Sequence, residues 1–226
     1  MSEIIKLQAA DGHTFSAYVA RPNAVPHAGV VLLQEIFGVN DHIRGVANGF
    51  AKLGYLVVAP ATFDRVQTEV SLGYFPDDVA LGRALKDKVE QLPLPGVMQD
   101  IQAAVSFASQ AGSVGVVGFC WGGLLTWRAA CMLDNLAGAV AYYGGGMTQG
   151  VEAERQALCP MMTHFGEQDK GIPIDTVKAF ANTHPDVQNH IYKADHGFNC
   201  DHRGSFNLEA ANMAFTRTAT FFAQNL

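Results

Sequence analysis

A single cysteine, Cys120, stands among glycines directly after an apolar run. Residues 113–124 read Ser-Val-Gly-Val-Val-Gly-Phe-Cys-Trp-Gly-Gly-Leu, so Gly118 and Gly122 lie two positions either side of Cys120. This spacing matches the nucleophile elbow G-x-S-x-G, with cysteine in the place of serine. In such an elbow a strand ends abruptly and a helix begins at once, with glycines where side chains would collide. The pattern predicts a thiolate nucleophile; the alternative is a small buried cysteine without chemistry.

A cysteine nucleophile needs a base to ionise it and a group that orients this base. In the elbow arrangement the acid and then the histidine follow the nucleophile along the chain, each on a loop after a strand. Asp169 and His196 both follow expected strands, so we assign them as acid and base; Glu167 and Asp195 are the competing acids. The other candidate histidines, which we expect in the core or on the surface, are His164, His184, His190 and His202.

A second set of candidate residues follows an earlier apolar run. Glu35 comes directly after Val-Val-Leu-Leu at 30–33, where a carboxylate is costly to bury without a partner. It is therefore either a solvated loop residue or a functional one. In the functional interpretation Glu35 lies beside the nucleophile, and the backbone N–H groups of Ile36 and Trp121 form an oxyanion hole.

The elements that must position these residues alternate between apolar runs and amphipathic stretches. This alternation predicts an α/β fold, with a mostly parallel central sheet covered by helices on both faces. Asp11-Gly12 favours a hairpin, so we expect an antiparallel N-terminal edge and one domain over residues 1–226. Strands are expected at 4–7, 14–19, 29–34, 55–59, 114–118, 137–142, 160–165 and 189–193. Helices are expected at 41–53, 78–91, 97–110, 122–132, 174–182 and 205–224, with a possible substrate-covering loop at 62–77.

Composition narrows the class of protein. The chain has 226 residues, 49% of them hydrophobic and 16% charged, which is typical of a well-buried globular protein. The net charge is −6 and the basic residues are scattered, so we expect no nucleic-acid partner. We see neither a secretory signal nor an apolar run that spans a bilayer, and therefore expect a cytoplasmic protein without a membrane partner. The four cysteines show no paired spacing, so we expect thiols.

The segments Gln-Glu-Ile-Phe-Gly at 34–38 and Gly-Phe-Cys-Trp-Gly-Gly at 118–123, with Asp169 and His196, resemble the dienelactone hydrolase (carboxymethylenebutenolidase) family of α/β-hydrolases. The resemblance extends over nearly the whole chain. It implies a triad of Cys120, His196 and Asp169 that hydrolyses a cyclic enol ester or another activated ester through a thioester. It also implies that Glu35 pairs with the resting thiol and takes its proton when substrate binds.

The resemblance further implies that Phe37 and Trp121 shape the substrate pocket, and it fails at one position. Members that hydrolyse dienelactone carry an arginine four residues after the triad histidine for the substrate carboxylate, whereas this chain has Cys200. Arg203 lies nearby in a different register. For a second family arginine the candidate is Arg83, with Arg65 as the alternative. The loss of one bidentate arginine weakens recognition of an anionic lactone.

Two further interpretations concern cofactors and function. Cys200, Asp201 and His202 are possible metal ligands, but adjacent loop residues rarely converge on one ion, so we expect neither metal nor cofactor. We expect a small-molecule ester or lactone as substrate and a monomer, with a dimer as the alternative. The remaining alternatives are an esterase or lactonase of other specificity on the same triad, and a non-catalytic binding protein on the same fold.

Overall fold

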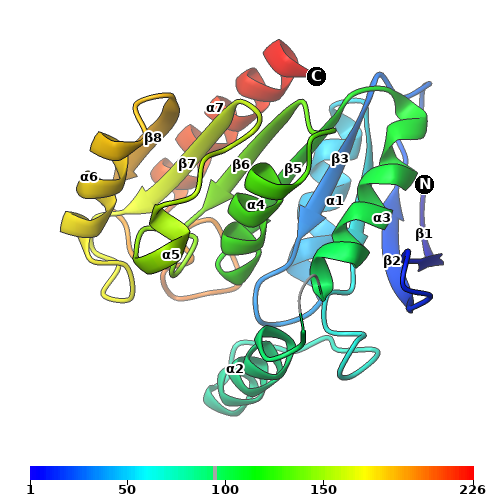
Figure 1. The fold of residues 1–226 in the computed structure, drawn as a ribbon, viewed down its shortest axis with the longest axis horizontal. Helices are drawn as coiled ribbons and strands as arrows, with labels where there is room; N and C mark the ends of the chain where they lie inside the picture. The colour runs from blue at the N-terminus through cyan, green and yellow to red at the C-terminus, as the bar shows by residue number, and fades with distance from the viewer. Residues whose placement is uncertain (94–95) are drawn as a thin grey trace. The chain divides into compact units, whose positions relative to one another are not determined.

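The computed structural model describes residues 1–93 and 96–226 (Figure 1). The chain divides into two compact units, Met1–Val114 and Gly115–Leu226, which we call the N-terminal and the C-terminal unit. Each is an α/β layer arrangement, as the alternating sequence pattern predicts. The expectation of one domain over 1–226 stays a prediction.

In the N-terminal unit the sheet order is β1-β2-β4-β3. The hairpin of β1 and β2 turns through Gly12, which has a positive φ of 86°, and β2 also pairs antiparallel with β4. In contrast, β3 and β4 run parallel. The expected antiparallel N-terminal edge is therefore confirmed. The strands are β1 (Ser2–Gln8), β2 (Thr14–Ala20), β3 (Ala28–Leu33) and β4 (Tyr55–Pro60).

Helices cover both faces of this sheet. Figure 1 shows α1 (Asp41–Lys52) behind the strands and α3 (Val97–Ala108) in front of them. The side chain of Asn40 accepts a hydrogen bond from the N–H of Ile43 and so caps α1. Helix α2 (Pro76–Glu90) begins with a proline, which suits the first helical position, and the short η1 (Ser109–Ala111) follows α3.

In the C-terminal unit the sheet order is β5-β6-β7-β8, and neighbouring strands are parallel. Figure 1 shows α4 in front of this sheet and α7 behind it. The strands are β5 (Val114–Phe119), β6 (Gly138–Tyr142), β7 (Met161–Gly166) and β8 (Val187–Tyr192). The helices are α4 (Trp121–Met132), α5 (Gly150–Ala153), α6 (Ile174–Thr183) and α7 (Leu208–Asn225).

The core lies along the central strands. Every residue of β3 to β7 is buried, because helices cover both faces, and this burial is why these strands read as continuous apolar runs. Helix α5 was not expected from the sequence, since four residues are too short to show a helical period. Among the described residues, no helix combines the length and the apolar character that a bilayer span requires.

A charged cluster ties together three segments of the N-terminal unit. The Arg65 guanidinium donates to both carboxylate oxygens of Asp100, at 2.7 Å each, and to Asp11 in the hairpin turn. His13 Nδ1 lies 3.1 Å from the same Asp100 carboxylate, whose side chain is 0% exposed. Because a buried carboxylate is tolerated only when it is paired, Arg65 is a structural residue of this unit.

Replacement of Arg65 tests this interpretation. Arg65→Met leaves the buried Asp100 carboxylate without its arginine, and should lower the free energy of unfolding by about 3 kcal/mol. The matched control is Arg21→Met, which removes an arginine paired with Glu3 on the surface, with side chains 40% and 48% exposed, and should cost less than about 1 kcal/mol. Urea unfolding at pH 7 measures both losses; equal losses would show that Asp100 does not depend on Arg65.

Candidate active site

Cys120 stands at the sharp turn between β5 and α4. Its φ of 56° and ψ of −116° lie outside the regions that side-chain-bearing residues prefer, so the backbone is strained there. A Cβ at Gly118 would collide with the carbonyl oxygen of Gly122, and one at Gly123 would lie 2.7 Å from the carbonyl oxygen of Tyr142. The turn is closed by the Cys120 N–H, which donates to Tyr142 at 3.0 Å. These close approaches explain why the sequence has glycines around the cysteine.

The loops after β7 and β8 carry Asp169 and His196. The two loops are joined by backbone hydrogen bonds from Glu167 to Tyr192 and from Gln168 to Ala194, at 2.8 Å and 3.0 Å. The two backbones also approach each other closely at Gly166, where a Cβ would collide with the Ala194 carbonyl oxygen. The two loops therefore hold their side chains in a defined relative position.

These elements bring the side chains of Cys120, His196 and Asp169 together within the C-terminal unit. His196 Nε2 lies 3.1 Å from Cys120 Sγ, and His196 Nδ1 lies 2.6 Å from Asp169 Oδ2. The Asp169 side chain is 1% exposed, whereas the imidazole is 25% exposed and Cys120 is half-buried. The distances fit the expected order of nucleophile, base and orienting acid.

The electrostatics of this group favour a charged imidazole. Burial alone lowers the pKa of His196, but the adjacent Cys120 sulfur and the hydrogen bond and charge of Asp169 outweigh it and raise the pKa to about 10. A protonated imidazole at this place can donate its Nε2 proton to a group that binds beside Cys120.

Two residues of the site were missed in the sequence analysis. The ring of Tyr143 lies edge-on to the His196 ring with centroids 5.1 Å apart, and its φ is 37°. The backbone N–H of Gly171 donates to Asp169 Oδ1 at 2.8 Å, so the second carboxylate oxygen is also satisfied. The position of Tyr143, directly after β6 and before three glycines, was a usable signal, whereas the Gly171 contact had none.

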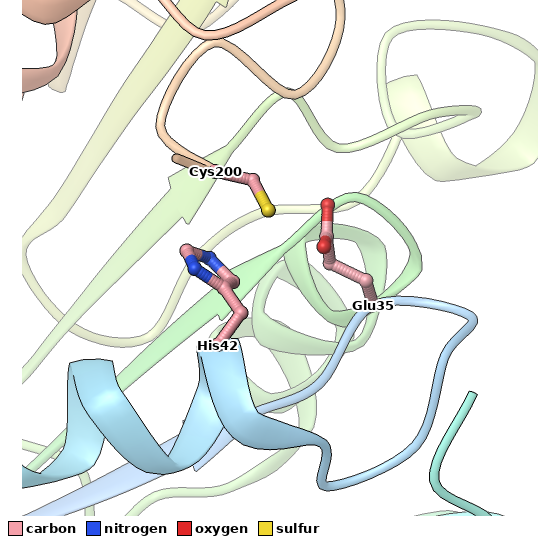
Figure 2. Close-up of side chains that lie close together, drawn as sticks. All are labelled: Glu35, His42 and Cys200. Atoms are coloured by element: carbon pink, nitrogen blue, oxygen red, sulfur yellow. The ribbon is translucent and has the colours of Figure 1, made fainter. Parts of the chain in front are cut away.

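The predicted oxyanion donors belong to different units. The Trp121 N–H lies in the first turn of α4, where N–H groups have no intrahelical acceptor and carry the positive end of the helix dipole. Ile36 follows β3 in the N-terminal unit, between Glu35 and Phe37, and all three are buried. Figure 2 shows Glu35 on the loop after β3 and His42 on α1. Cys200, which is labelled there too, is 0% exposed and belongs to the C-terminal unit.

The loop expected to cover substrate packs on this segment. The Leu72 N–H donates to the Phe37 carbonyl at 2.8 Å, and Gly38 forms an isolated bridge with Ser71. A Cβ at Gly82 of α2 would collide with the carbonyl oxygen of Ile36. The backbone from 36 to 38 is thus held by its own unit on two sides.

The candidate substrate arginines differ in how they are engaged. Arg65 is held by Asp11 and Asp100, as described above, and burial against these carboxylates makes it unsuited to a substrate. Arg83 is exposed on α2. Arg203 is half-buried, and its guanidinium packs so closely on Gly197 that a Cβ there would collide with it. Arg83 and Arg203 therefore remain the candidates.

The competing residues occupy other roles. His164 is fully buried, and its ring nitrogens lie 2.8 Å from Tyr192 Oη and 3.0 Å from Thr218 Oγ1; burial lowers its pKa well below 6.5. His184 Nε2 lies 2.8 Å from the Ala153 carbonyl oxygen. Of the competing acids, Glu167 is exposed and Asp195 accepts from the backbone N–H of His196, not from its ring. His190 is half-buried in β8, and His202 is exposed beside Asp201.

The nucleophile turn, the order of the three side chains and the parallel sheet define a hydrolase of the α/β-hydrolase class. Comparison with known proteins narrows this class. The chain belongs to the dienelactone hydrolase family, whose sequence model matches residues 15–226. This family membership makes it a hydrolytic enzyme.

Individual relatives agree with this assignment. The carboxymethylenebutenolidase of Pseudomonas putida is 29% identical over 99% of this chain and 97% of its own length. A Synechocystis protein named "putative carboxymethylenebutenolidase" is 32% identical over 93% of this chain and 92% of its own length. The crystal structure of a "putative dienelactone hydrolase" from Klebsiella pneumoniae superimposes with a TM-score of 0.83 at 29% identity, covering 99% of both chains.

Alkylation of the thiols tests the reactivity of Cys120. Burial raises the pKa of Cys131 to about 12 and that of Cys159 to about 11, so both remain protonated near neutral pH. Brief treatment with iodoacetamide at pH 7 should therefore label Cys120 at least about 10-fold faster than either. Peptide mapping by mass spectrometry measures the three rates. His196→Ala should slow labelling of Cys120 alone, and equal labelling of all three thiols would contradict an activated sulfur.

Proposed function

We propose that this chain hydrolyses a lactone or an activated ester, such as an enol lactone of the dienelactone type, through a thioester on Cys120. The observation that carries this proposal is the contact of Cys120 Sγ with His196 Nε2 at 3.1 Å, backed by Asp169 at 2.6 Å. The family assignment supplies the reaction class, and this contact supports the mechanism.

In the first half of the proposed reaction the Cys120 thiolate attacks the ester carbonyl carbon. The carbonyl oxygen becomes an oxyanion, which the N–H groups of Trp121 and Ile36 stabilise by hydrogen bonds. As the carbon–oxygen ester bond breaks, the imidazolium of His196 donates its Nε2 proton to the leaving oxygen. For a lactone this opens the ring and leaves the acyl group on the sulfur.

In the second half the same imidazole acts as a base. Formation of the thioester removes the negative charge of the sulfur, which is one of the causes that raise the pKa of His196. The neutral imidazole then takes a proton from water as this water attacks the thioester carbonyl. The tetrahedral intermediate collapses, the carboxylic acid product leaves, and the thiolate returns beside a protonated His196.

Glu35 and Phe37 complete the proposed site. Glu35 is 1% exposed and precedes the proposed oxyanion donor Ile36, and a buried carboxylate is costly unless it is paired. Following the family resemblance, we assign Glu35 the role of pairing with the resting thiol and taking its proton when substrate binds. Phe37, which stacks edge-on with Tyr74 at 4.5 Å, is assigned to the pocket wall.

A specific observation favours a neutral substrate as the second candidate. Cys200 stands where dienelactone-hydrolysing relatives carry an arginine, and it is completely buried. Of the arginines that remain, Arg83 is exposed and Arg203 packs on Gly197. A carboxylate on the substrate would thus meet a weaker clamp, and a neutral lactone or simple ester would lose nothing.

Hydrolysis by Cys120→Ala tests the proposed nucleophile. The variant should lose at least about 1,000-fold in kcat/KM on p-nitrophenyl acetate and dienelactone, because no other group can form the covalent intermediate. Cys131→Ala, which removes a thiol held protonated by burial, is the matched control and should keep its activity. Acid-quenched wild type should carry the acyl mass on the Cys120 peptide; unchanged turnover in Cys120→Ala would refute the assignment.

The same assay separates the two substrate candidates. If Arg83 or Arg203 binds a carboxylate, Arg83→Gln or Arg203→Gln should raise KM for an anionic lactone about 10-fold and leave a neutral lactone unaffected. If neither variant changes KM for the anionic lactone, no arginine binds a carboxylate and the neutral-ester specificity holds.

The pH dependence tests the role of Asp169. Acylation needs a protonated His196, so kcat/KM should fall as pH rises through about 10, the pKa of His196. Asp169→Asn removes a cause of the raised pKa, and should move this limb to lower pH and reduce kcat at least about 100-fold. Asp195→Asn is the matched control, because Asp195 accepts from the backbone N–H of His196 and not from its ring. An alkaline limb that stays in place in Asp169→Asn would contradict the assignment.

A further inference from the structure

The N-terminal unit contains an open cavity of about 250 Å³ that the proposed chemistry does not use. It lies over one face of the hairpin and is lined by side chains from β1, β2, α1 and the loop after β4. The lining includes Ile4, Lys6, Ser16, Tyr18, Arg44 and Asp64. Neither the three side chains of the triad nor the proposed oxyanion and substrate residues line it.

The floor of the cavity consists of two rows of side chains. Ile4 pairs with Tyr18 across the hairpin, and Lys6 pairs with Ser16. Alternate residues of a strand point to the same face, so all four side chains face the cavity, and the two rows lie about 7 Å apart. One row offers an apolar and an aromatic surface, and the other offers polar groups.

Arg44 lies at the row formed by Ile4 and Tyr18 and has no carboxylate partner among the described residues. The Arg44 guanidinium carbon stands 5.7 Å from the centroid of the Tyr18 ring, and Arg44 Nε donates to the carbonyl of Val39 at 3.0 Å. None of the ion pairs found in residues 1–93 and 96–226 involves Arg44. Its terminal nitrogens therefore keep a planar pair of donors of the kind that binds a carboxylate.

At the row formed by Lys6 and Ser16, the charges of Lys6 and Asp64 balance, and one carboxylate oxygen has no donor. Lys6 Nζ donates to Ser16 Oγ at 2.9 Å, and the Ser16 N–H donates to Asp64 Oδ2 at 2.7 Å, so the two opposite charges meet at one serine. Asp64 is 7% exposed, and its Oδ1 has no hydrogen-bond partner. A buried carboxylate oxygen without a donor favours a ligand that brings a hydroxyl group. Glu69, also in the lining, is exposed, so solvent screens its charge.

We propose that this cavity is a second binding site, which takes a small hydroxylated carboxylate with a flat apolar body. The carboxylate pairs with Arg44, the apolar body lies against Tyr18 between Ile4 and Val70, and the hydroxyl group reaches Ser16 and Asp64. The carboxylate and the hydroxyl group stand at opposite ends of the ligand, and so each can reach one of the two rows. The site is independent of the triad chemistry proposed above.

Binding of 4-hydroxybenzoate tests the proposal. Titration of the full chain at low ionic strength, followed by isothermal calorimetry, should give a dissociation constant of about 1 mM or tighter. 4-Hydroxybenzamide, which lacks the negative charge, should bind at least about 10-fold more weakly, and benzoate, which lacks the hydroxyl group, should also bind more weakly. Backbone amide NMR shifts should map to Ser16, Tyr18 and Val39.

Variants of Arg44 separate this site from adventitious binding. Arg44→Gln should weaken 4-hydroxybenzoate at least about 10-fold, and Arg44→Lys, which keeps the charge but loses the planar fork, should weaken it less. Arg21→Gln is the control: this arginine lies directly after β2 and pairs with Glu3, so the affinity should stay unchanged. Equal affinity of Arg44→Gln and wild type, equal binding of the amide, or shifts confined to Cys120 and His196 would each overturn the proposal. The comparison of the two ligands on wild type holds even if a variant does not fold.

Discussion

The contact between Cys120 Sγ and His196 Nε2, at 3.1 Å, is the interaction on which the proposed chemistry of the C-terminal unit depends. A thiol at such a distance exchanges its proton with the ring, whereas one a few ångströms further away does not. The two atoms come from positions 76 residues apart in the chain, so no local preference can bring them together. The parallel register of β5 to β8 does so, because it places the ends of the strands, and therefore the loops that follow them, at the same edge.

Close backbone approach is what makes the elbow possible. Gly118 and Gly123 permit contacts that any side chain would prevent, and the strained backbone of Cys120 is held by this packing and by the hydrogen bond to Tyr142. Strain of this kind costs of the order of 1–3 kcal/mol, so it persists only where the surrounding structure determines it. The same reasoning applies to the loops after β7 and β8, which are fastened to each other around Gly166. The turn at Cys120 and the joined loops after β7 and β8 therefore keep the sulfur and the imidazole within hydrogen-bond distance of each other.

Much of this arrangement was predictable from the sequence. Strands buried on both faces are continuous apolar runs, so β3 to β7 could be located, and the elbow pattern with its downstream strand ends named Cys120, Asp169 and His196. The choice of Asp169 over Asp195 rested on spacing alone; the structure distinguishes them, since Asp195 meets the backbone of His196 and Asp169 meets its ring. The partners of Arg65, the four residues of α5 and the cavity under Arg44 had no signal. Each depends on side chains that approach one another only in the folded chain.

The two groups beside His196 cannot have the same role in the proposed cycle. Asp169 is buried and accepts from both the ring and the Gly171 N–H, so it holds the imidazole in every step. The charge on Cys120 is present only while the sulfur is not acylated. Asp169 therefore sets the orientation and the lower limit of basicity, and the sulfur supplies the change that turns the imidazole from acid to base. These roles explain why Asp169 is buried and Cys120 is half-buried. Asp169 must hold the ring in one orientation, whereas Cys120 must reach the substrate.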